Sequence, residues 1–489
     1  MPDTINIRKG LDIPISGNAE KRLTDARSIT TYAVKPTDFE GFVPRLLVAE
    51  GDSVALGDAL FCDKKDERIR FTSPVDGHVK AIVRGEKRKL LEVIVETDYK
   101  STGSTGADCT QKTPQTPEDI KEAMLRWGLW PMLRQRPFGT IANPDDKPKA
   151  IFVSAFDSAP LAPDYDFMLQ GREAFFAKGL EALGNLTEGK VHVCFRQGQG
   201  LDCFVPRNDV KGRSDGSTSQ QLNIHFIKGP HPAGNVGTQI AHIDPINKGE
   251  VVWTMNAQDV AVLGELVSTG VYRPEKVVSV AGPQLRNPHY YHIKAGACVE
   301  SLLAGQLPHA EYPKLESEAP EKRFRIISGN VLSGTLIQKE GFIGAYDCLL
   351  SILPEGDQSE FMGWLMPGVK KFSFSRTFLS GFMPKQEVEV MGTPLPRFKR
   401  FWDFNTNLHG EERAYVMTGE FEKVFPFDIY PLQLIKACIV GDIELMENLG
   451  IYEVLPEDFA LCEFIDTSKT DIQQIIHDGL EKVRKEQEN

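Results

Sequence analysis

The sequence contains no closely spaced cysteines of the kind that hold zinc or iron–sulfur clusters. Its eight cysteines stand singly, none in a CxxC arrangement, and the nearest two are nine residues apart. Ligands of such centres usually come at short spacings because they must converge on one ion or cluster. Scattered cysteines behind an N-terminus with no apolar leader are typical of free thiols in a reducing cytoplasm. The cysteines are Cys62, Cys109, Cys194, Cys203, Cys298, Cys348, Cys438 and Cys462.

Long apolar runs and an excess of basic residues are absent as well. The longest apolar candidates, such as Val260–Val267, fall well short of the roughly 18 residues that cross a bilayer. Acidic residues outnumber basic ones by 68 to 56, a net charge of −12. This balance argues against nucleic-acid binding and against a polybasic lipid anchor. At 489 residues the chain exceeds one compact core, so we expect about three domains in a soluble or peripheral protein.

Residues 1–100 are expected to form a small β domain. Short apolar runs alternate with Gly/Asp/Pro turns, which is typical of a sandwich or barrel. The pattern around the segment EGDSVALGDALF resembles the biotinyl/lipoyl carrier fold, in which a modified lysine sits at a hairpin tip. Asp63-Lys64 invites that comparison, but Lys64 lies in a longer charged segment, so we expect an unmodified, solvated loop.

The rest of the chain is predicted to be multi-domain α/β and α+β. A Ser/Thr/Gly/Pro-rich linker precedes a helix that starts at Thr116-Pro117 and stops at Gly128. Strand–helix alternation then predicts a mainly parallel, Rossmann-like sheet. The expected boundaries are 101–117 for the linker, 118–270 for the Rossmann-like domain, 271–340 for a small α+β unit with a polar insertion at 308–322, 341–430 for a β-rich segment and 431–489 for a helical domain.

A glycine-rich loop follows a predicted strand and is the first candidate site. In GPHPAGNVGT, Gly229, Gly234 and Gly237 would let the backbone approach a phosphate or a flavin ring. The loop matches neither GxGxxG nor GxxxxGK[ST], and its two prolines lack amide donors. A structural turn or a subunit contact is therefore favoured over a nucleotide cradle. His231 has no acidic or cysteine partner at a metal-like spacing, so we expect a surface or core histidine.

Two basic, aromatic-rich segments form the other candidates. Trp130, Arg134, Arg136 and Phe138 belong to the first, and such residues suit the core of an interface or the lipid–water boundary. The second spans 370–402, where base stacking is an alternative to a protein-contacting or core-edge β surface, and the acidity of the chain favours the latter. Paired carboxylates, a GxSxG elbow and an HExxH helix are absent. No complete catalytic site is visible in this chain alone.

Several motifs spread over nearly the whole chain together resemble one family. They are INIRKGLDIPISG at 5–17, Asp63-Lys64-Lys65, FTSP at 71–74, Arg136-Pro137-Phe138, the GPHPAGNVGT loop at 229–238, Asp244-Pro245, Val252-Trp253-Thr254, ISGNVLSG at 327–334 and Leu461-Cys462. The combination is similar to the NqrA family, one of the six components of the bacterial sodium-translocating NADH:quinone reductases. That family is related to RnfC and to the NADH- and flavin-binding subunit of respiratory complex I.

The resemblance implies a peripheral subunit on the cytoplasmic face of the bacterial inner membrane. The enzyme would be a six-subunit respiratory-chain translocase that couples electron transfer from NADH to a quinone such as ubiquinone with sodium export. Its FAD, FMN, riboflavin and iron–sulfur centres would lie in the partner subunits, NqrB to NqrF, and this chain would carry none. The family also implies a β-grasp-like (SLBB-type) unit at 271–340 and a helical C-terminal domain.

The role implied for this chain is to dock membrane subunits, chiefly the adjoining NqrB, or to help form the quinone site. Quinone or partner contacts are expected at Trp130, Arg134, Arg136, Phe138, Gly229, His231, Gly234 and Gly237. RnfC-like relatives carry CxxCxxC runs near the C-terminus, whereas Leu461-Cys462 offers one thiol, which cannot hold a cluster. The alternative is a flavin-binding NADH dehydrogenase subunit of an RnfC-like complex, with FMN on the glycine-rich loop.

Overall fold

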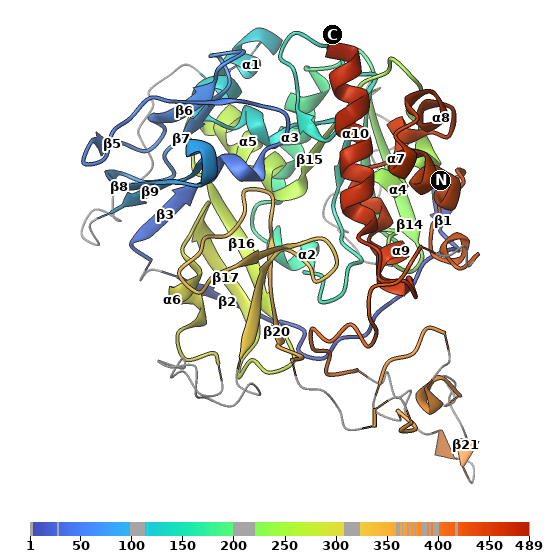
Figure 1. The fold of residues 1–489 in the computed structure, drawn as a ribbon. Helices are drawn as coiled ribbons and strands as arrows, with labels where there is room; N and C mark the ends of the chain where they lie inside the picture. Colours follow the sequence, from blue (N-terminus) through green and yellow to red (C-terminus); the bar gives the residue numbers. More distant parts are fainter. Residues whose placement is uncertain are drawn as a thin grey trace.

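The computed structural model describes most of the chain and shows its domains packed side by side (Figure 1). No helix within these residues is both long and apolar enough to cross a membrane. The predicted linker and the 308–322 insertion fall largely or wholly outside them. The described ranges are 3–26, 29–97, 113–114, 116–198, 221–307, 323–357, 362–363, 365–368, 371–375, 378–382, 389–390, 393–394, 401–415 and 419–488.

Two small antiparallel sheets form the N-terminal β domain, in agreement with the expected β domain, although the apolar runs did not predict β3 and β5. Glycine turns such as Gly51 and Gly57, both at positive φ, reverse the chain between strands. The rings of Phe42, Phe61 and Phe71 stack in the interior, with centroids 4.6–6.3 Å apart. One sheet has the order β3 (Thr31–Val34), β9 (Leu90–Glu96), β8 (Gly77–Arg84) and β5 (Ser53–Val54), and the other β4 (Pro44–Leu46), β6 (Ala59–Asp63) and β7 (Arg70–Thr72).

The first 25 residues depart from the expected 1–100 domain. Strand β1 (Asp3–Asn6) pairs in parallel with a strand of the α/β domain, and β2 (Glu20–Asp25) pairs in parallel with β17 (His289–Lys294) of a six-stranded sheet. Each strand completes the edge of a sheet built from distant sequence. Local periodicity carries no information about such a partner, which explains the difference.

The α/β domain has a seven-stranded sheet that is mainly parallel, as predicted. Helices α3 (Glu173–Gly184) and α5 (Ala257–Thr269) pack so closely that a side chain at Gly264 would overlap the Phe175 carbonyl. The smaller helices are α2 (Tyr165–Met168) and α4 (Val236–Ile243). The strand order is β1, β14 (Leu222–Lys228), β13 (Lys190–Arg196), β12 (Ala150–Ser154), β15 (Val252–Asn256), then antiparallel β10 (Arg134–Arg136) and β11 (Thr140–Ile141).

Helix α1 (Pro117–Trp127) leads into this domain with the predicted ends. Thr116 and Asp119 form a reciprocal capping box, and Pro117 occupies the first turn. Gly128 ends the helix in the left-handed conformation at φ 71°. The short 3₁₀ helix η4 (Trp130–Met132) follows and delivers the chain to β10.

A six-stranded mixed sheet forms the third unit and crosses the expected boundary at residue 340. Strand β20 (Leu349–Pro354) pairs with both β16 (Glu275–Ala281) and β18 (Phe324–Ser328). The prediction of a β-rich 341–430 segment was wrong for the described residues, where the other strands are the two-residue β21 (Glu389–Val390) and β22 (Thr393–Pro394). The remaining elements are β17 (His289–Lys294), β19 (Thr335–Ile337) and α6 (Val299–Leu303).

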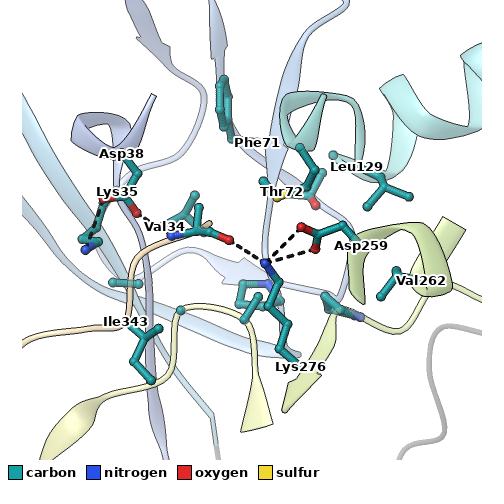
Figure 2. Close-up of a pocket in the computed structure, with 18 of the residues that line it drawn as sticks. Val34, Lys35, Asp38, Phe71, Thr72, Leu129, Asp259, Val262, Lys276 and Ile343 are labelled. Carbon is teal, nitrogen blue, oxygen red and sulfur yellow. Dashed lines mark hydrogen bonds and ion pairs between the residues drawn. The ribbon is translucent and has the colours of Figure 1, made fainter. Parts of the chain in front are cut away.

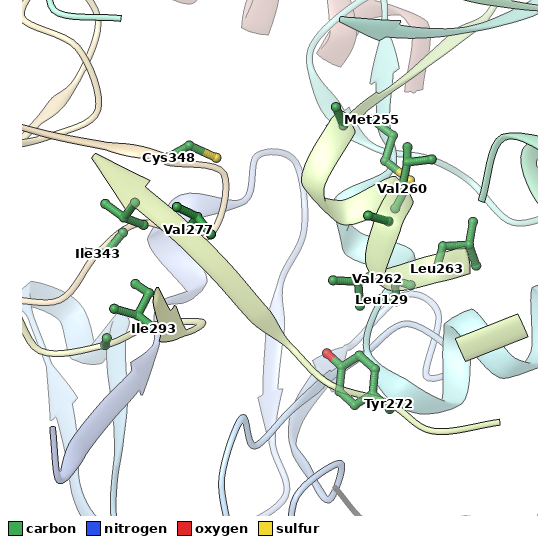
Figure 3. Packing of buried hydrophobic residues seen from close by; sticks show 14 of the residues in the cluster. Leu129, Met255, Val260, Val262, Leu263, Tyr272, Val277, Ile293, Ile343 and Cys348 are labelled. Atoms are coloured by element: carbon green, nitrogen blue, oxygen red, sulfur yellow. The ribbon is translucent and has the colours of Figure 1, made fainter. Parts of the chain in front are cut away.

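The hydrophobic core is continuous between the α/β domain and the third sheet. Figure 3 shows Val260, Val262 and Leu263 of α5 on one side and Val277 and Ile293 of the third sheet on the other. All five side chains are buried in the same cluster. Because apolar burial dominates folding free energy, the two units stabilise one another.

The C-terminal region is helical, as predicted, and has its own core. Its helices gather beside the α/β domain in Figure 1, with the two-residue turn at Gly441-Asp442 joining the first pair. The helices are α7 (Pro431–Val440), α8 (Ile443–Asn448), α9 (Ala460–Ile465) and α10 (Ile472–Glu488), with the 3₁₀ helix η10 (Pro456–Phe459) before α9.

Candidate functional site

The glycines of the 229–237 loop serve close packing within the chain. A Cβ atom at Gly234 would overlap the backbone nitrogen of Ser158. At Gly237, in the first turn of α4, it would lie 2.5 Å from both carboxylate oxygens of Asp458 in the C-terminal region. Gly229 is equally close to the backbone of Ile7, which follows β1. Each glycine therefore admits another part of this same chain.

His231 is a buried, neutral member of that loop. Its Nδ1 lies 3.1 Å from the Ser158 hydroxyl, and its backbone N–H donates to Asp12 at 3.0 Å. Burial lowers the pKa of His231 to about 4. His231 is 3% exposed, so of the two expected environments, core and surface, it occupies the core.

Arg136 joins the glycine-rich loop to the C-terminal region. Its guanidinium lies 3.1 Å from Asp458 Oδ2 and 2.8 Å from Glu457 Oε1. The side chains of Arg136 and Asp458 are 2% and 0% exposed. Burial raises the pKa of Asp458 against the opposing pull of the guanidinium, and its Oδ1 has no hydrogen-bond partner among the described residues. The pair is a buried structural junction.

Arg134 and Phe138 flank Arg136 and line an open cleft. The cleft has a volume of about 580 Å³ and lies between the 332–334 turn, η10 and α10. The Arg134 guanidinium stacks over the Tyr346 ring at 5.1 Å and lies 3.8 Å from Glu457. These two side chains, unlike Arg136, face a space that another molecule can enter.

Trp130 lies in the core. Its indole is 1% exposed, meets the Trp253 ring edge-on at 5.5 Å and donates to the Ala142 carbonyl at 2.8 Å. A side chain so enclosed offers no surface to a docking partner. Its neighbours Leu129 and Met132, however, line a separate cavity.

That cavity lies where three units of the fold meet. It is a partly open cavity of about 80 Å³ and is mostly apolar, with walls from the N-terminal β domain, from η4 and α5, and from the third sheet. Figure 2 shows Phe71, Leu129, Val262 and Ile343 around it. Apolar cavities at domain junctions with a few convergent polar groups are the usual form of small-molecule sites.

Two lysine–carboxylate pairs supply the polar groups of the cavity. Lys276 lies 3.0 Å from Asp259 and donates to the Ala345 carbonyl at 2.5 Å. Burial opposes the charge on Lys276, but the attraction of Asp259 and other acids outweighs it and raises the lysine pKa. Both side chains are at most 6% exposed. The ammonium is therefore a charged donor in an apolar wall.

The second pair comes from the N-terminal domain. Lys35 lies 3.2 Å from Asp38, and donates to the Phe342 carbonyl at 3.2 Å. Burial raises the pKa of Asp38, so this carboxyl accepts a proton more readily than an exposed one. Figure 2 shows the two pairs on different walls of the cavity.

Sequence reasoning missed all four of these charged residues. The available signal was weak: Asp259 and Lys276 each adjoin an apolar run, at Val260–Val267 and Val277–Val280. A charge beside a buried run is also common at a surface, so only the packing of the domains identifies the pairs. No group of three or more His, Cys, Asp or Glu side chains suited to a metal occurs in the described part of the chain.

Comparison with known proteins agrees with the resemblance in the sequence. The family description "NqrA N-terminal barrel-sandwich hybrid domain" matches residues 5–98, "NqrA second alpha/beta domain" matches 115–272, and "NQRA C-terminal domain" matches 277–312. The NqrA subunit of the Na(+)-translocating NADH-quinone reductase of Rhodopirellula baltica is 36% identical over 484 residues, 98% of each chain. The chain belongs to the NqrA family.

Other NqrA relatives match at similar levels. The NqrA subunits of Hahella chejuensis and Yersinia pseudotuberculosis are 35% and 36% identical, and in each case the match covers 99% of this chain and 100% of the relative. A solved structure of NAD+-reducing [NiFe]-hydrogenase in the H2-reduced state aligns with 51% of this chain and 49% of its own at 13% identity and a TM-score of 0.35. A likeness of that size carries no argument.

Proposed function

We propose that this chain works as the NqrA component of a Na+-translocating NADH:quinone reductase and forms part of its quinone site. It would lie on the cytoplasmic face of the inner membrane, beside NqrB, in a complex with NqrB to NqrF. Electrons from NADH would pass through FAD, FMN, riboflavin and iron–sulfur centres of those partners. The observation that carries the proposal is the apolar cavity with its two buried lysine–carboxylate pairs.

The chemistry of the cavity suits a quinone ring. The flat ring is apolar and contacts side chains such as Phe71 and Val262, while its carbonyl oxygens accept hydrogen bonds from ammonium groups such as Lys276. Reducing a quinone to a quinol takes up two electrons and two protons. Asp38, whose pKa is raised by burial, is suited to deliver a proton to a reduced ring oxygen.

The glycine-rich loop supports a chain without its own flavin. A phosphate held at a helix start needs free backbone N–H groups and room in front of them. At Gly237 the Asp458 carboxylate and the Arg136 guanidinium occupy that room. In this proposal Gly229, His231, Gly234 and Gly237 hold the α/β domain against its neighbours, and Trp130 supports the cavity wall from behind.

Arg134 and Phe138 would contact a partner directly. They line the open cleft, where Arg134 is 30% exposed. Changing Arg134 to Ala and Phe138 to Ala together is expected to weaken attachment of the membrane subunits. Co-purification of the tagged variant with those subunits measures this, and unchanged recovery would contradict the role.

A cavity-filling substitution in the assembled complex tests the quinone site. Val262→Phe fills the space beside Lys276 and is expected to weaken quinone binding. A loss of roughly 1.4 kcal/mol in binding free energy would raise the KM for quinone about tenfold. Electron transfer from NADH to a soluble dye should be unchanged. The matched control is Val440→Phe, at a side chain that is 80% exposed. Normal quinone kinetics in an assembled Val262→Phe complex would overturn the site.

Should Val262→Phe fail to assemble, Val262→Ala enlarges the cavity instead and is expected to change the preference between quinones with short and with long side chains.

The visible spectrum of the isolated chain tests whether the chain binds a flavin of its own. A colourless protein that releases no flavin on denaturation is the expected result. A stoichiometric flavin bleached by NADH would instead establish a flavin-binding NADH dehydrogenase of the RnfC type.

A further inference from the structure

Four large apolar side chains are exposed on the segment after β20. Met362, Leu365, Met366 and Leu379 are 41%, 62%, 59% and 52% exposed. We call these four residues the apolar tip. Single exposed apolar residues are ordinary, but a contiguous group on a surface usually marks a place of contact.

Backbone hydrogen bonds hold the apolar tip together. The N–H of Leu365 donates to the Met362 carbonyl at 2.9 Å, and the N–H of Leu379 donates to the Pro367 carbonyl at 2.8 Å. The Lys371 ammonium lies 5.3 Å from the centre of the Phe378 ring, on the same short stretch. The tip is thus a folded feature that presents apolar side chains next to a cation.

The segment is anchored to the body on its other side. Trp402 donates its backbone N–H to Pro14 at 2.9 Å and accepts from the N–H of Ser16 at 3.0 Å. The Phe372 ring contacts the rings of Trp402 and Phe464, with centroids 6.4 and 6.2 Å apart. Figure 1 shows the segment, in orange, projecting from the body toward β21. Trp402 and Phe372 therefore attach the segment to the body.

Charge is concentrated in the same segment. Residues 361–402 contain seven Lys or Arg and two Glu, a net charge of +5, while the whole chain carries −12, so the rest carries −17. The same 42 residues contain seven of the 28 Phe and two of the five Trp. The chain-wide acidity that argued against lipid binding is an average over two oppositely charged parts.

We propose that the apolar tip docks on an anionic phospholipid surface. The Leu and Met side chains enter the boundary between headgroups and acyl chains, and the Lys371 ammonium in the same stretch attracts anionic headgroups. The net charge of +5 on residues 361–402 favours such a surface, and screening at physiological salt limits repulsion from acidic residues elsewhere to about 8–10 Å. The inference rests on the membrane-side placement in the proposed function.

Co-sedimentation of the purified full-length chain with vesicles tests the docking. We expect binding to phosphatidylcholine vesicles that contain phosphatidylglycerol, weaker binding to phosphatidylcholine alone, and release by salt. Replacing Leu365, Met366 and Leu379 by Ser should weaken binding about tenfold or more, because lipid affinity scales with buried apolar area. Lys371→Glu should weaken binding to the anionic vesicles selectively.

The matched control removes the same number of exposed apolar side chains elsewhere. Ile439, Val440 and Leu445 are 51%, 80% and 43% exposed, and replacing all three by Ser should leave vesicle binding unchanged. Equal loss in both triple variants, or no binding by the native chain, would overturn the docking. A tip variant that still binds vesicles but no longer co-purifies with the membrane subunits would also overturn the docking, because the tip would then bind protein. The proposed function is tested separately, by the quinone kinetics of the Val262→Phe complex and by the flavin spectrum of the native chain, and neither measurement uses a tip variant.

Discussion

The Arg136 guanidinium lies 3.1 Å from the Asp458 carboxylate, across 322 residues of sequence and with both groups removed from water. This contact joins strand β10 of the α/β domain to η10 of the C-terminal region. It also closes over Gly237, so the helix start that resembles a phosphate site is filled by the protein's own ion pair. The loop motif of the family is thereby part of a domain junction.

Breaking this pair should destabilise the chain strongly. Arg136→Met leaves the buried Asp458 carboxylate without its guanidinium, and removing one partner of a buried pair costs about 3–5 kcal/mol. A lowered urea midpoint for unfolding measures the effect. The control is Lys147→Met, which breaks the exposed Lys147–Glu188 pair and should not shift the midpoint. Equal midpoints for both variants would refute a structural role for Arg136.

Adding one methyl group at Gly237 should also destabilise the junction. In Gly237→Ala the new Cβ lies 2.5 Å from the Asp458 oxygens, and overpacking of this kind costs about 1–3 kcal/mol. Gly184→Ala is the matched control. Gly184 lies in helix α3, the atom nearest to the added methyl group is Gln221 Oε1 at 3.4 Å, and alanine favours helices. Thermal unfolding compares the two, and a Gly237→Ala variant as stable as the native chain would contradict the packing.

The stability of the chain should fall between pH 6.5 and 4 partly through His231. Burial lowers the pKa of this histidine to about 4, whereas an unfolded histidine titrates near 6.5. In that window the unfolded state binds more protons, so the free energy of unfolding decreases as the pH falls. His231→Gln removes the titration and should flatten the pH dependence of the urea midpoint. Some slope remains, because burial also lowers the pKa of His192 to about 4; parallel curves would contradict the assignment.

The cysteine thiols of the described residues should resist modification. Cys62, Cys194, Cys298, Cys348, Cys438 and Cys462 are all buried, and burial raises the pKa of Cys348 to about 11 and that of Cys438 to about 12. Thiolate is the reactive form, so a disulfide reagent should react slowly until the protein unfolds. Replacing Cys109 and Cys203 by Ser gives a variant in which these six are the only cysteines. Rapid reaction of more than one thiol in that folded variant would contradict the burial.

Local signals in the sequence were enough for many elements. Thr116, Pro117 and Gly128 predicted both ends of α1, because capping depends on the few residues around a helix end. The alternation of apolar strands and helices likewise predicted the mainly parallel sheet, and the motifs predicted the family. These features rest on backbone propensity and on residue patterns within one segment.

By itself, then, the sequence determined the family, both ends of α1, the mainly parallel sheet of the α/β domain, and the acidic charge. The tertiary structure alone decided which distant segments meet: β1 beside β14, Arg136 against Asp458, and Lys35 and Lys276 on two walls of one cavity. The physical reason is that a charged residue is expected at the solvent-exposed surface from sequence alone, and only the packing of another domain over it shows that it is buried. Burial and pairing across hundreds of residues are properties of the packed fold, and no local pattern encodes them.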